Sequence, residues 1–300
     1  MVYFRSLKPQ KDDTIGRLFT GGGYFLQPKA RTMPDSPYIV KPNKKIHLSD
    51  WPSDDSGQFK DKDEAVKETE KNLRKLSDLQ YRMYAEAKHA LLIVFQAMDA
   101  GGKDGAISNV FSGVNPQGCE VHSFKGPSTL EKSHDYLWRI HAAVPARGMI
   151  GIFNRSHYES VLVERVKELV PEKVWSKRYD SINCFERMLA DEGTVILKFF
   201  LHISRDEQKR RLEARLADPD KNWKFSPSDV QERAYWKQYQ EAFEDLLGKC
   251  STKYAPWVIV PSDRKWMRNW VVSETIVSAL EELDMKFPKP APGIEKMKVE

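Results

Sequence analysis

The chain contains 300 residues, of which 40% are hydrophobic and 30% are charged, and it carries a formal net charge of +5. This composition predicts a globular chain with a substantial core, and no apolar run approaches the roughly 18 residues that a membrane-spanning helix needs. The small positive excess suits a polyanionic partner, such as nucleic acid, an anionic membrane or inorganic polyphosphate, without choosing among them.

Three further sequence features narrow the class of protein. The first 31 residues lack the continuous apolar core of a signal peptide, so a cytoplasmic protein without a membrane partner is expected. Cys119, Cys184 and Cys250 are widely spaced and form no CxxC pair, which argues against a disulfide framework or a zinc site. Basic residues alternate with acidic ones and we find no nucleic-acid recognition motif, so no nucleic-acid partner is expected.

Residues 1–60 differ in composition from the rest of the chain. They contain six prolines and the Gly21–Gly23 triplet, which predicts an irregular N-terminal extension, partly wrapped on the core and partly mobile. Residues 61–290 are predicted to form the main domain, and residues 291–300 a flexible tail.

From residue 61 onward the pattern predicts an α/β domain. Apolar residues recur every three to four positions over 65–88, which indicates a long helix. Strand-like apolar runs then alternate with amphipathic segments, an order typical of a parallel sheet with helices on both faces. The predicted strands are 91–95, 119–124, 149–153, 194–201 and 257–260. The predicted helices that follow them are 103–114, 128–143, 157–168, 171–191, 204–217, 228–248 and 264–284.

The run LLIVFQAMDAGGKDG has the pattern of a phosphate-binding loop with two changes. The general motif is Gly, four residues, Gly-Lys and then Ser or Thr, placed between a strand and a helix N-terminus that binds phosphate. Gly102 and Lys103 fit, whereas Ala97 replaces the first glycine and Asp104 replaces the hydroxyl residue that holds magnesium. Asp99 is the candidate to take over the metal. The predicted phosphate-binding residues of the loop are Ala100, Gly101, Gly102, Lys103, Asp104 and Gly105.

A second polar segment, GIFNRSHYE, follows the third predicted strand. In P-loop kinases this place usually holds the acid that organises magnesium. Here the residue is Asn154, so the negative charge must come from Asp99 or Glu159. Arg155 can bind a phosphate in bidentate fashion. His157 is interpreted as a structural hydrogen-bonding residue, because transfer to an anionic phosphate acceptor needs no general base.

Residues 205–229 combine a basic helix with a polar loop. In nucleotide kinases an arginine-bearing lid closes over the transferring phosphoryl group and excludes water. The alternative is a solvated surface helix, because acidic residues are interspersed with the basic ones. The position after the fourth predicted strand favours a lid. Its basic side chains are Arg205, Lys209, Arg210, Arg211 and Arg215.

Several motifs together resemble the family-2 polyphosphate kinases. They are DAGGKDG, FKGPS, DYLWR, FNRSHYE, KFFLHIS and the run that ends in ADPDKNWKFSPSD, and they follow one another in this order along the chain. The resemblance extends from about residue 41 to about residue 288. The resemblance implies a P-loop kinase fold with a helical lid. It also implies magnesium-dependent, reversible transfer of the terminal phosphoryl group between inorganic polyphosphate and nucleoside phosphates.

The resemblance implies roles for individual residues. The catalytic set is expected to be Asp99, Lys103, Arg155 and Glu159, with Asp99 and Glu159 as metal ligands. Two Mg²⁺ ions are expected, with Mn²⁺ able to substitute. The acceptor nucleotide is expected to contact Asp135, Arg139, Asn154 and Glu159. Polyphosphate is expected to contact the loop, Arg155 and the five basic lid residues.

The substrate range is implied by the second motif. Many members of the family have aspartate in place of Asn154 and Trp-Tyr-Asn in place of residues 157–159. The motif with Asn154 and Glu159 resembles that of the subgroup that phosphorylates both nucleoside mono- and diphosphates. AMP, ADP and ATP are the expected nucleotides, with GMP and GDP as further acceptors, and a homodimer or homotetramer is expected.

Two other functions stay open from the sequence. An ATP-dependent nucleoside monophosphate kinase would share the fold and the lid, but Ala97 and Asp104 argue against it. A non-catalytic polyanion-binding protein could keep a relic loop, but Lys103, Asp99 and the arginine-rich segment argue against that function.

Overall fold

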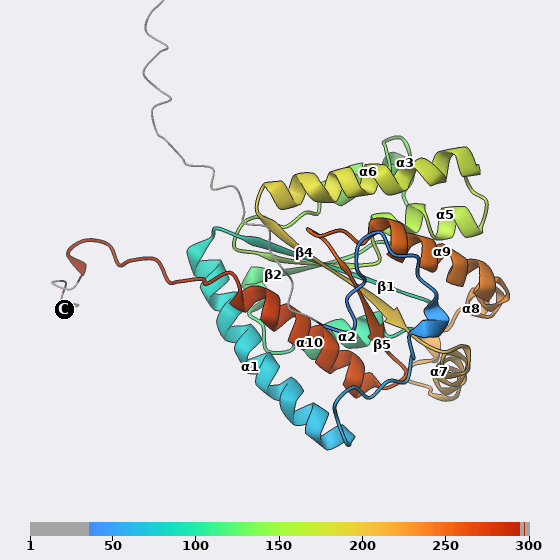
Figure 1. The fold of residues 1–300 in the computed structure, drawn as a ribbon, viewed down its shortest axis with the longest axis horizontal. Helices are drawn as coiled ribbons and strands as arrows, with labels where there is room; N and C mark the ends of the chain where they lie inside the picture. Colours follow the sequence, from blue (N-terminus) through green and yellow to red (C-terminus); the bar gives the residue numbers. More distant parts are fainter. Residues whose placement is uncertain (1–35, 295–296, 298–300) are drawn as a thin grey trace, which may run out of the picture.

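A five-stranded parallel sheet forms the centre of the domain in the computed structural model, which describes residues 36–294 and residue 297 (Figure 1). The strand order is β2-β3-β1-β4-β5, and all neighbouring strands are parallel. The predicted α/β fold is therefore confirmed, and each strand lies within two residues of its predicted bounds. The strands are β1 (Ala90–Ala97), β2 (Cys119–Ser123), β3 (Ile150–Asn154), β4 (Thr194–His202) and β5 (Trp257–Pro261).

The side chains of the central strand alternate between two buried cores. In β1, Leu91, Ile93 and Phe95 face one core, and Leu92 and Val94 face the other. Successive side chains of a strand point to opposite faces of the sheet, so a strand covered on both faces must be apolar throughout. This requirement explains the unbroken apolar run that precedes the glycine-rich loop.

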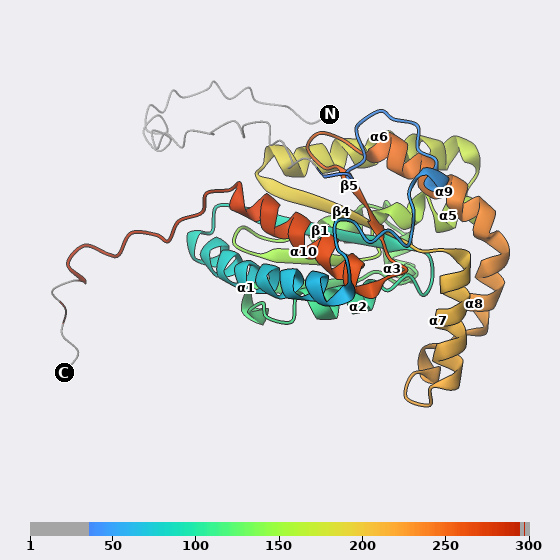
Figure 2. The same ribbon diagram turned by 60° about the horizontal axis from the view of Figure 1, so that its bottom comes forward.

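Three helices cover one face of the sheet (Figures 1 and 2). The long predicted helix begins three residues early, because the Asp61 side chain caps it by accepting a hydrogen bond from the Glu64 backbone N–H at 2.9 Å. It packs along the last helix of the domain, and Asn72 Nδ2 donates to Glu274 Oε2 across the contact at 2.9 Å. The three helices are α1 (Lys62–Glu86), α2 (Lys103–Val110) and α10 (Lys265–Glu281).

The opposite face is covered by a second group of helices (Figure 1). Buried residues of this group pack against Leu92 and Val94 of β1. No helix among the described residues has the length and apolar character that crossing a membrane requires. The group contains α4 (Trp138–His141), α5 (Val163–Val166), α6 (Glu172–Asp191) and α9 (Trp236–Cys250), and the exposed turn α3 (Thr129–Lys132) lies nearby in sequence.

Several predicted helices are shorter or more interrupted than the sequence indicated. The helix predicted over 128–143 breaks between α3 and α4, where Asp135 Oδ1 accepts a hydrogen bond from the Leu137 N–H at 2.9 Å. Such a local side-chain bond competes with helix formation. The segment predicted as one helix over 157–168 instead forms a 3₁₀ turn over 157–160 and the short helix α5, and that over 228–248 divides into three segments. The 3₁₀ turns are η2 (Leu48–Asp50), η3 (Pro116–Gly118), η4 (His157–Ser160), η5 (Asn222–Lys224) and η6 (Arg233–Tyr235).

Residues 36–60, which belong to the predicted extension, pack on the domain. Ile39 forms an antiparallel bridge with Val258 of β5. The Val40 N–H donates to the Trp257 carbonyl, and the Ile259 N–H donates to the carbonyl of Tyr38, each at 2.9 Å. This segment therefore occupies the free edge of β5.

A helical projection, residues 205–235, extends from the body of the domain beyond the carboxyl ends of the strands (Figure 2). It contains α7 (Arg205–Ala217), η5, α8 (Pro227–Glu232) and η6. Ser204 Oγ caps α7 by accepting from the Glu207 N–H at 3.0 Å, and Ser226 begins α8 with a capping box. We call this segment the projection below.

Candidate functional site

The loop between β1 and α2 leaves a helix N-terminus open at the carboxyl edge of the sheet. Gly102 is the N-cap of α2 with a φ of 97°, and no side chain of the described residues caps it. The Gly101 N–H donates to the Met98 carbonyl at 2.9 Å and tightens the turn. A Cβ on Gly101 would lie 2.5 Å from the Ala97 Cβ, so this position requires glycine. Unpaired N–H groups and the helix dipole together form an anion site.

The structure explains why alanine can replace the first glycine of the motif. Ala97 is the last residue of β1, where the backbone is extended and any residue is tolerated. Lys103 folds back across the loop, and its Nζ donates to the Ala97 carbonyl at 3.3 Å. Burial, together with the nearby Arg155, lowers the pKa of Lys103. A partly desolvated cation in a phosphate-binding loop interacts strongly with an arriving anion.

Arg155 joins the second motif to the loop. Its Nη2 lies 3.2 Å from Asp99 Oδ1, and its Nη1 lies 3.9 Å from Glu159 Oε2. The residue has a φ of 63°, which is unfavourable for a residue with a side chain and is often found at functional sites. Burial raises the pKa of Glu159. The four predicted catalytic residues, Asp99, Lys103, Arg155 and Glu159, therefore lie together.

Polar contacts connect the remaining residues of the two motifs. Asn154 Nδ2 donates to Asp104 Oδ1 at 2.8 Å, so the two changed positions of the motifs are hydrogen-bonded to each other. When its amide is oriented so that Oε1 accepts from Ser156, Gln96 Nε2 donates to Glu159 Oε1 at 3.0 Å. Among residues 36–294 and 297, no three carboxylate, histidine or cysteine side chains form a closed metal cage.

A fully buried polar cluster underlies the second motif. Glu186 of α6 accepts from the Tyr158 hydroxyl at 2.8 Å and lies 3.2 Å from His157 Nε2. Lys198 of β4 donates to Glu186 Oε2 at 2.6 Å and to the Cys250 carbonyl at 2.7 Å. Burial lowers the pKa of His157, which favours a neutral imidazole. The cluster therefore holds the η4 turn, which carries Glu159, against α6.

The base of the projection contacts the loop. Gln208 Nε2 donates to the Asp99 carbonyl at 2.9 Å, and Arg211 Nη1 donates to the Ala100 carbonyl at 3.1 Å. Arg211 Nε also pairs with Glu207 Oε1 at 2.7 Å. These bonds attach α7 to the loop main chain on the side of β4.

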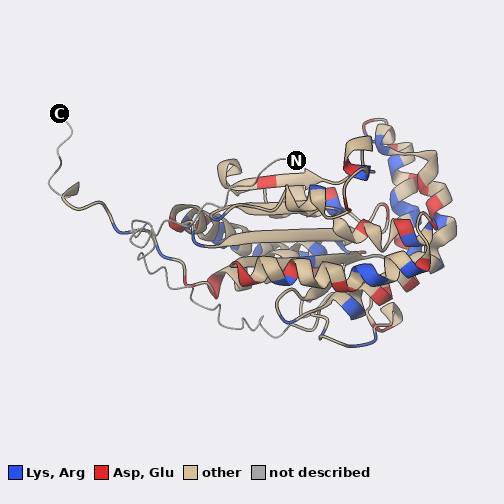
Figure 3. Cartoon of the chain, turned by 90° about the horizontal axis from the view of Figure 1, so that it is seen from above, with Lys and Arg blue, Asp and Glu red and all other residues tan. Residues whose placement is uncertain are grey.

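The other four predicted basic lid residues form no hydrogen bond with the loop. Arg205, Lys209 and Arg210 are exposed, and Arg215 Nη1 lies 3.4 Å from Asp229 Oδ2. Figure 3 shows lysine and arginine interleaved with aspartate and glutamate along the projecting helices at the right. Of the five predicted lid side chains, only Arg211 contacts the loop in this arrangement.

A cavity of about 540 Å³ lies beside the carboxyl end of β2. Arg139 lines it, lies with its guanidinium 5.4 Å from the Phe124 ring centroid, and donates to the Lys125 carbonyl at 2.8 Å. Asp135, which the sequence grouped with Arg139, is exposed and does not line the cavity. The pair is therefore separated in the structure: one residue is at the cavity and the other stabilises the turn before α4.

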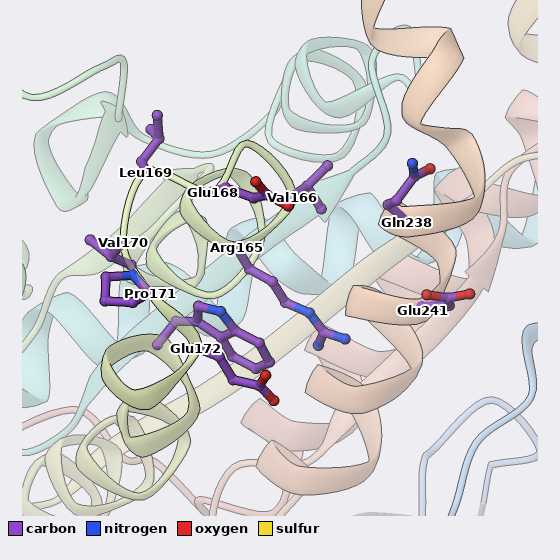
Figure 4. Close-up of a pocket in the computed structure, with 10 residues that line it drawn as sticks. Arg165, Val166, Glu168, Leu169, Val170, Pro171, Glu172, Gln238 and Glu241 are labelled. Atoms are coloured by element: carbon purple, nitrogen blue, oxygen red, sulfur yellow. The ribbon is translucent and has the colours of Figure 1, made fainter.

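A second cavity of about 560 Å³ lies between the α5–α6 connection and α9, and none of the predicted site residues lines it. Figure 4 shows Arg165 extending toward α9, where Gln238 and Glu241 lie. Arg165 Nη1 pairs with Asp245 Oδ2 at 2.7 Å, and its guanidinium lies 4.4 Å from the Trp175 ring centroid. These contacts already engage the arginine, so the group formed by Asp99, Lys103, Arg155 and Glu159, rather than this cavity, is the candidate active site.

Sequence reasoning missed four residues near the site. Lys198 gave a signal, because it is a charged residue in a strand that is otherwise apolar between Thr194 and His202. Gln96, Gln208 and Arg268 gave none, since a single polar residue on an amphipathic helix or at a strand end is ordinary. Arg268 of α10 is buried, and its Nη1 donates to the Gly102 carbonyl at 3.1 Å.

Comparison with known proteins identifies close relatives. A family model described as polyphosphate kinase 2 (PPK2) matches residues 59–288. An AMP/ADP-polyphosphate phosphotransferase of Meiothermus ruber is 52% identical over 264 residues, which cover 88% of this chain and 99% of that protein. An ADP-polyphosphate phosphotransferase of Rhodopseudomonas palustris is 45% identical over 271 residues, covering 86% and 94%. The crystal structure of polyphosphate kinase 2 from Arthrobacter aurescens TC1 matches with a TM-score of 0.82 and 38% identity, covering 86% and 95%.

Proposed function

The chain belongs to the polyphosphate kinase 2 family, and we infer that it is an enzyme that transfers phosphoryl groups from inorganic polyphosphate to AMP and ADP. The similarity to a Meiothermus ruber protein named for both acceptors carries this inference, because it extends over nearly the whole of that protein. The convergence of Lys103, Arg155, Asp99 and Glu159 at one helix N-terminus is the arrangement that phosphoryl transfer requires.

We propose that the open N-terminus of α2 holds the phosphate next to the scissile bond. Lys103 and Arg155 lie close enough to affect each other electrostatically and would neutralise charge on the transferring group. In phosphoryl transfer the protein takes little part in the covalent chemistry. Alignment of the reacting groups and stabilisation of charge in the transition state therefore account for most of the catalysis. The neutral, buried His157 takes no part in proton transfer under this proposal and supports the turn that holds Glu159.

The residues present fit divalent metal ions. Mg²⁺ usually keeps several waters and binds through one or two carboxylates together with substrate phosphates, so it needs no closed protein cage. Asp99 and Glu159 would hold the ions, and both carboxylates now lie against Arg155. Bound metal would withdraw charge from the phosphate oxygens. We propose that the site binds two Mg²⁺ ions and that Mn²⁺ can replace them.

We propose that the cavity beside β2 receives the acceptor nucleoside. Phe124 offers an apolar ring and Arg139 a guanidinium beside it, which suits a base and its ribose or phosphate. Asn154, at the end of the neighbouring strand, would lie between this cavity and the loop. GMP and GDP remain proposed as further acceptors, because no contact to a particular base edge is defined.

Other features of the protein remain proposals. The projection would act as the lid, with Arg205, Lys209, Arg210, Arg211 and Arg215 turned toward polyphosphate when it closes. A homodimer or homotetramer, a cytoplasmic location, and the absence of nucleic-acid and membrane partners are also proposed. Light scattering of the purified protein would measure the oligomeric state.

A single mixing experiment tests the proposed function. Purified protein is incubated with Mg²⁺, long-chain polyphosphate and either AMP or ADP, without added ATP, and nucleotides are separated by chromatography. Formation of ADP and ATP is the expected result. Activity that appears only when ATP is the donor would instead identify a nucleoside monophosphate kinase, and polyphosphate binding without turnover would identify a polyanion-binding protein.

A further inference from the structure

Arg268 is a buried arginine beside the phosphate-binding loop. It lies in the first turns of α10, and only 2% of its surface is exposed. Its Nη1 donates to the Gly102 carbonyl at 3.1 Å, while Nε and Nη2 both donate to Asn269 Oδ1, at 3.1 and 2.7 Å. A guanidinium has five N–H donors, so two of them have no partner among the described residues.

The charge of Arg268 is not balanced by the protein. No carboxylate of the described residues forms an ion pair with it, and the charged group that most affects it is another arginine, Arg211. Burial and the charge of Arg211 lower the pKa of Arg268 to about 10, so the guanidinium still carries its charge at neutral pH. Arg211 differs, because Glu207 lies 2.7 Å from its Nε. Burying an unpaired cation is costly, and natural proteins compensate such charges with an anion.

The geometry of the loop brings both arginines to the same point. A Cβ added to Gly102 would lie 2.4 Å from Arg268 Nη1 and 3.3 Å from Arg211 Nη1. A Cβ added to Gly105 would lie 3.4 Å from Arg268 Nη1. The two guanidinium groups therefore stand within a few ångströms of the main chain whose N–H groups form the anion site.

The sheet order assigns these arginines to one side of the loop. On the proposed acceptor side, Asn154 ends β3 and Phe124 follows β2, and both strands lie on one side of β1. Arg211 and Arg268 follow β4 and β5, on the other side. In phosphoryl transfer the attacking and leaving oxygens lie roughly in line, so the donor chain must leave the site opposite the acceptor.

We propose that Arg268, together with Arg211, is a donor-binding residue that holds the phosphates of polyphosphate behind the one being transferred. The proposal rests on the proposed function and adds the residues that bind the leaving chain. The bound polyanion completes the ion pair that the protein itself does not provide. It follows that Arg268 destabilises the protein without donor and stabilises the complex with donor.

The test compares three substitutions with a matched control. Arg268→Met removes the charge, Arg268→Gln removes the charge but keeps a polar side chain with N–H donors, and Arg268→Lys keeps the charge. Arg187→Met, at an exposed position of α6, is the control. Melting temperatures are measured with and without tripolyphosphate in the absence of nucleotide, and the KM values for polyphosphate and ADP are measured separately.

We expect Arg268→Met and Arg268→Gln to melt no lower than the unmodified protein without ligand and to lose most of the shift caused by tripolyphosphate. Their KM for polyphosphate should rise by at least about tenfold, as for other charge-assisted hydrogen bonds, while the KM for ADP changes by less than about twofold. Arg268→Lys should keep most of the shift. The control should behave as the unmodified protein does.

A normal tripolyphosphate shift in the folded Gln variant would overturn the proposal, as would equal increases of both KM values. A lower melting temperature with an unchanged shift would make Arg268 a purely structural residue. If the Met variant does not fold, the comparison of Gln with Lys decides the question. Failure of the proposed function is distinguishable, because the unmodified protein would then phosphorylate no ADP from polyphosphate.

Discussion

The guanidinium of Arg155 lies 3.2 Å from the carboxylate of Asp99, Nη2 to Oδ1, across the gap between neighbouring strands β3 and β1. A phosphate would compete with Asp99 for the arginine, and a metal ion would compete with Arg155 for the carboxylate. Binding of substrate and metal should therefore separate the pair, so that Arg155 binds the phosphate and Asp99 binds the metal ion. This exchange makes the two residues dependent on each other and motivates the first prediction.

Substitution of Lys103 or Asp99 should abolish transfer and leave the fold intact. Lys103→Met and Asp99→Asn each remove one charge at the open helix N-terminus, and losses of at least about 100-fold in kcat are expected for groups that stabilise developing charge. Steady-state kinetics and circular dichroism measure both properties. Lys237→Met, at a side chain that is 88% exposed, is the control. Normal turnover in either folded variant would refute the assignment.

Chelation of divalent metal should stop the reaction reversibly. The proposed ligands are only two carboxylates, so the metal must be shared with the phosphates and should be readily removed. EDTA is expected to abolish ATP formation and excess Mg²⁺ to restore it. Glu159→Gln should increase the Mg²⁺ concentration required for half-maximal activity. An unchanged metal requirement in that variant would exclude Glu159 as a ligand.

Stability should decrease as the pH falls through the histidine range. Burial lowers the pKa of His157 and of His202, so the unfolded chain binds protons more readily than the folded one below a pH of about 6.5. The free energy of unfolding is therefore not reduced by these histidines above that pH. Below it, the free energy of unfolding decreases by up to about 1.4 kcal/mol per pH unit for each histidine. Urea unfolding between pH 7.5 and 5.5 measures the slope.

Single substitutions of His157 and His202 measure how much each contributes to the pH dependence of stability. His157→Gln and His202→Gln should each reduce the pH slope, and the double variant should reduce it further. His134→Gln, at an exposed position, is the control. If the slope of the double variant equals that of the unmodified protein, burial of these two rings does not cause it.

The buried pair of Lys198 and Glu186 should show strong coupling. Both side chains are 0% exposed, so Lys198→Met alone or Glu186→Leu alone leaves an uncompensated buried charge, at a cost of about 3–5 kcal/mol each. The double variant should be more stable than the sum of the single effects predicts, by about 2 kcal/mol. Denaturant unfolding of all four proteins completes the cycle, and additive effects would show that the pair is not coupled.

Substitutions in the cavity beside β2 should affect acceptor and donor differently. Arg139→Ala and Phe124→Ala are expected to raise the KM for AMP and ADP by roughly tenfold each, from the loss of a charged or aromatic contact. The KM for polyphosphate should stay unchanged, because its proposed site lies on the other side of β1. A matched increase for polyphosphate would instead indicate a general loss of the active conformation.

The sheet could be predicted from the sequence because most of its strands are mainly apolar runs between polar segments, although β2 contains Glu120 and His122 and β4 contains Lys198. The fold class and all five strands follow from that pattern alone. The helices near the site were less predictable. Between α3 and α4 the Asp135 side chain bonds to the backbone, and at η4 the buried His157 and Tyr158 side chains tie the turn to Glu186. Tertiary contacts of this kind override helical periodicity.

The site residues also differ in whether the sequence can predict them. Lys103, Arg155 and Glu159 occupy motif positions at strand ends, and such positions converge in a parallel sheet. Arg268 comes from a helix more than 160 residues beyond the loop and has no motif of its own. Its proximity to Gly102 depends on how α10 packs against α2, which no local pattern specifies.

The bridge between Ile39 and Val258 sets a limit on how far the chain can be trimmed. The family match begins at residue 59, and a protein that starts there would lack Tyr38 and Val40, which are backbone hydrogen-bond partners of β5. Without these partners, β5 would present an unpaired, apolar edge to solvent, which promotes edge-to-edge aggregation. For expression and crystallisation, a start before residue 36 therefore keeps the edge of β5 covered, whereas a start at the boundary of the family match would expose it.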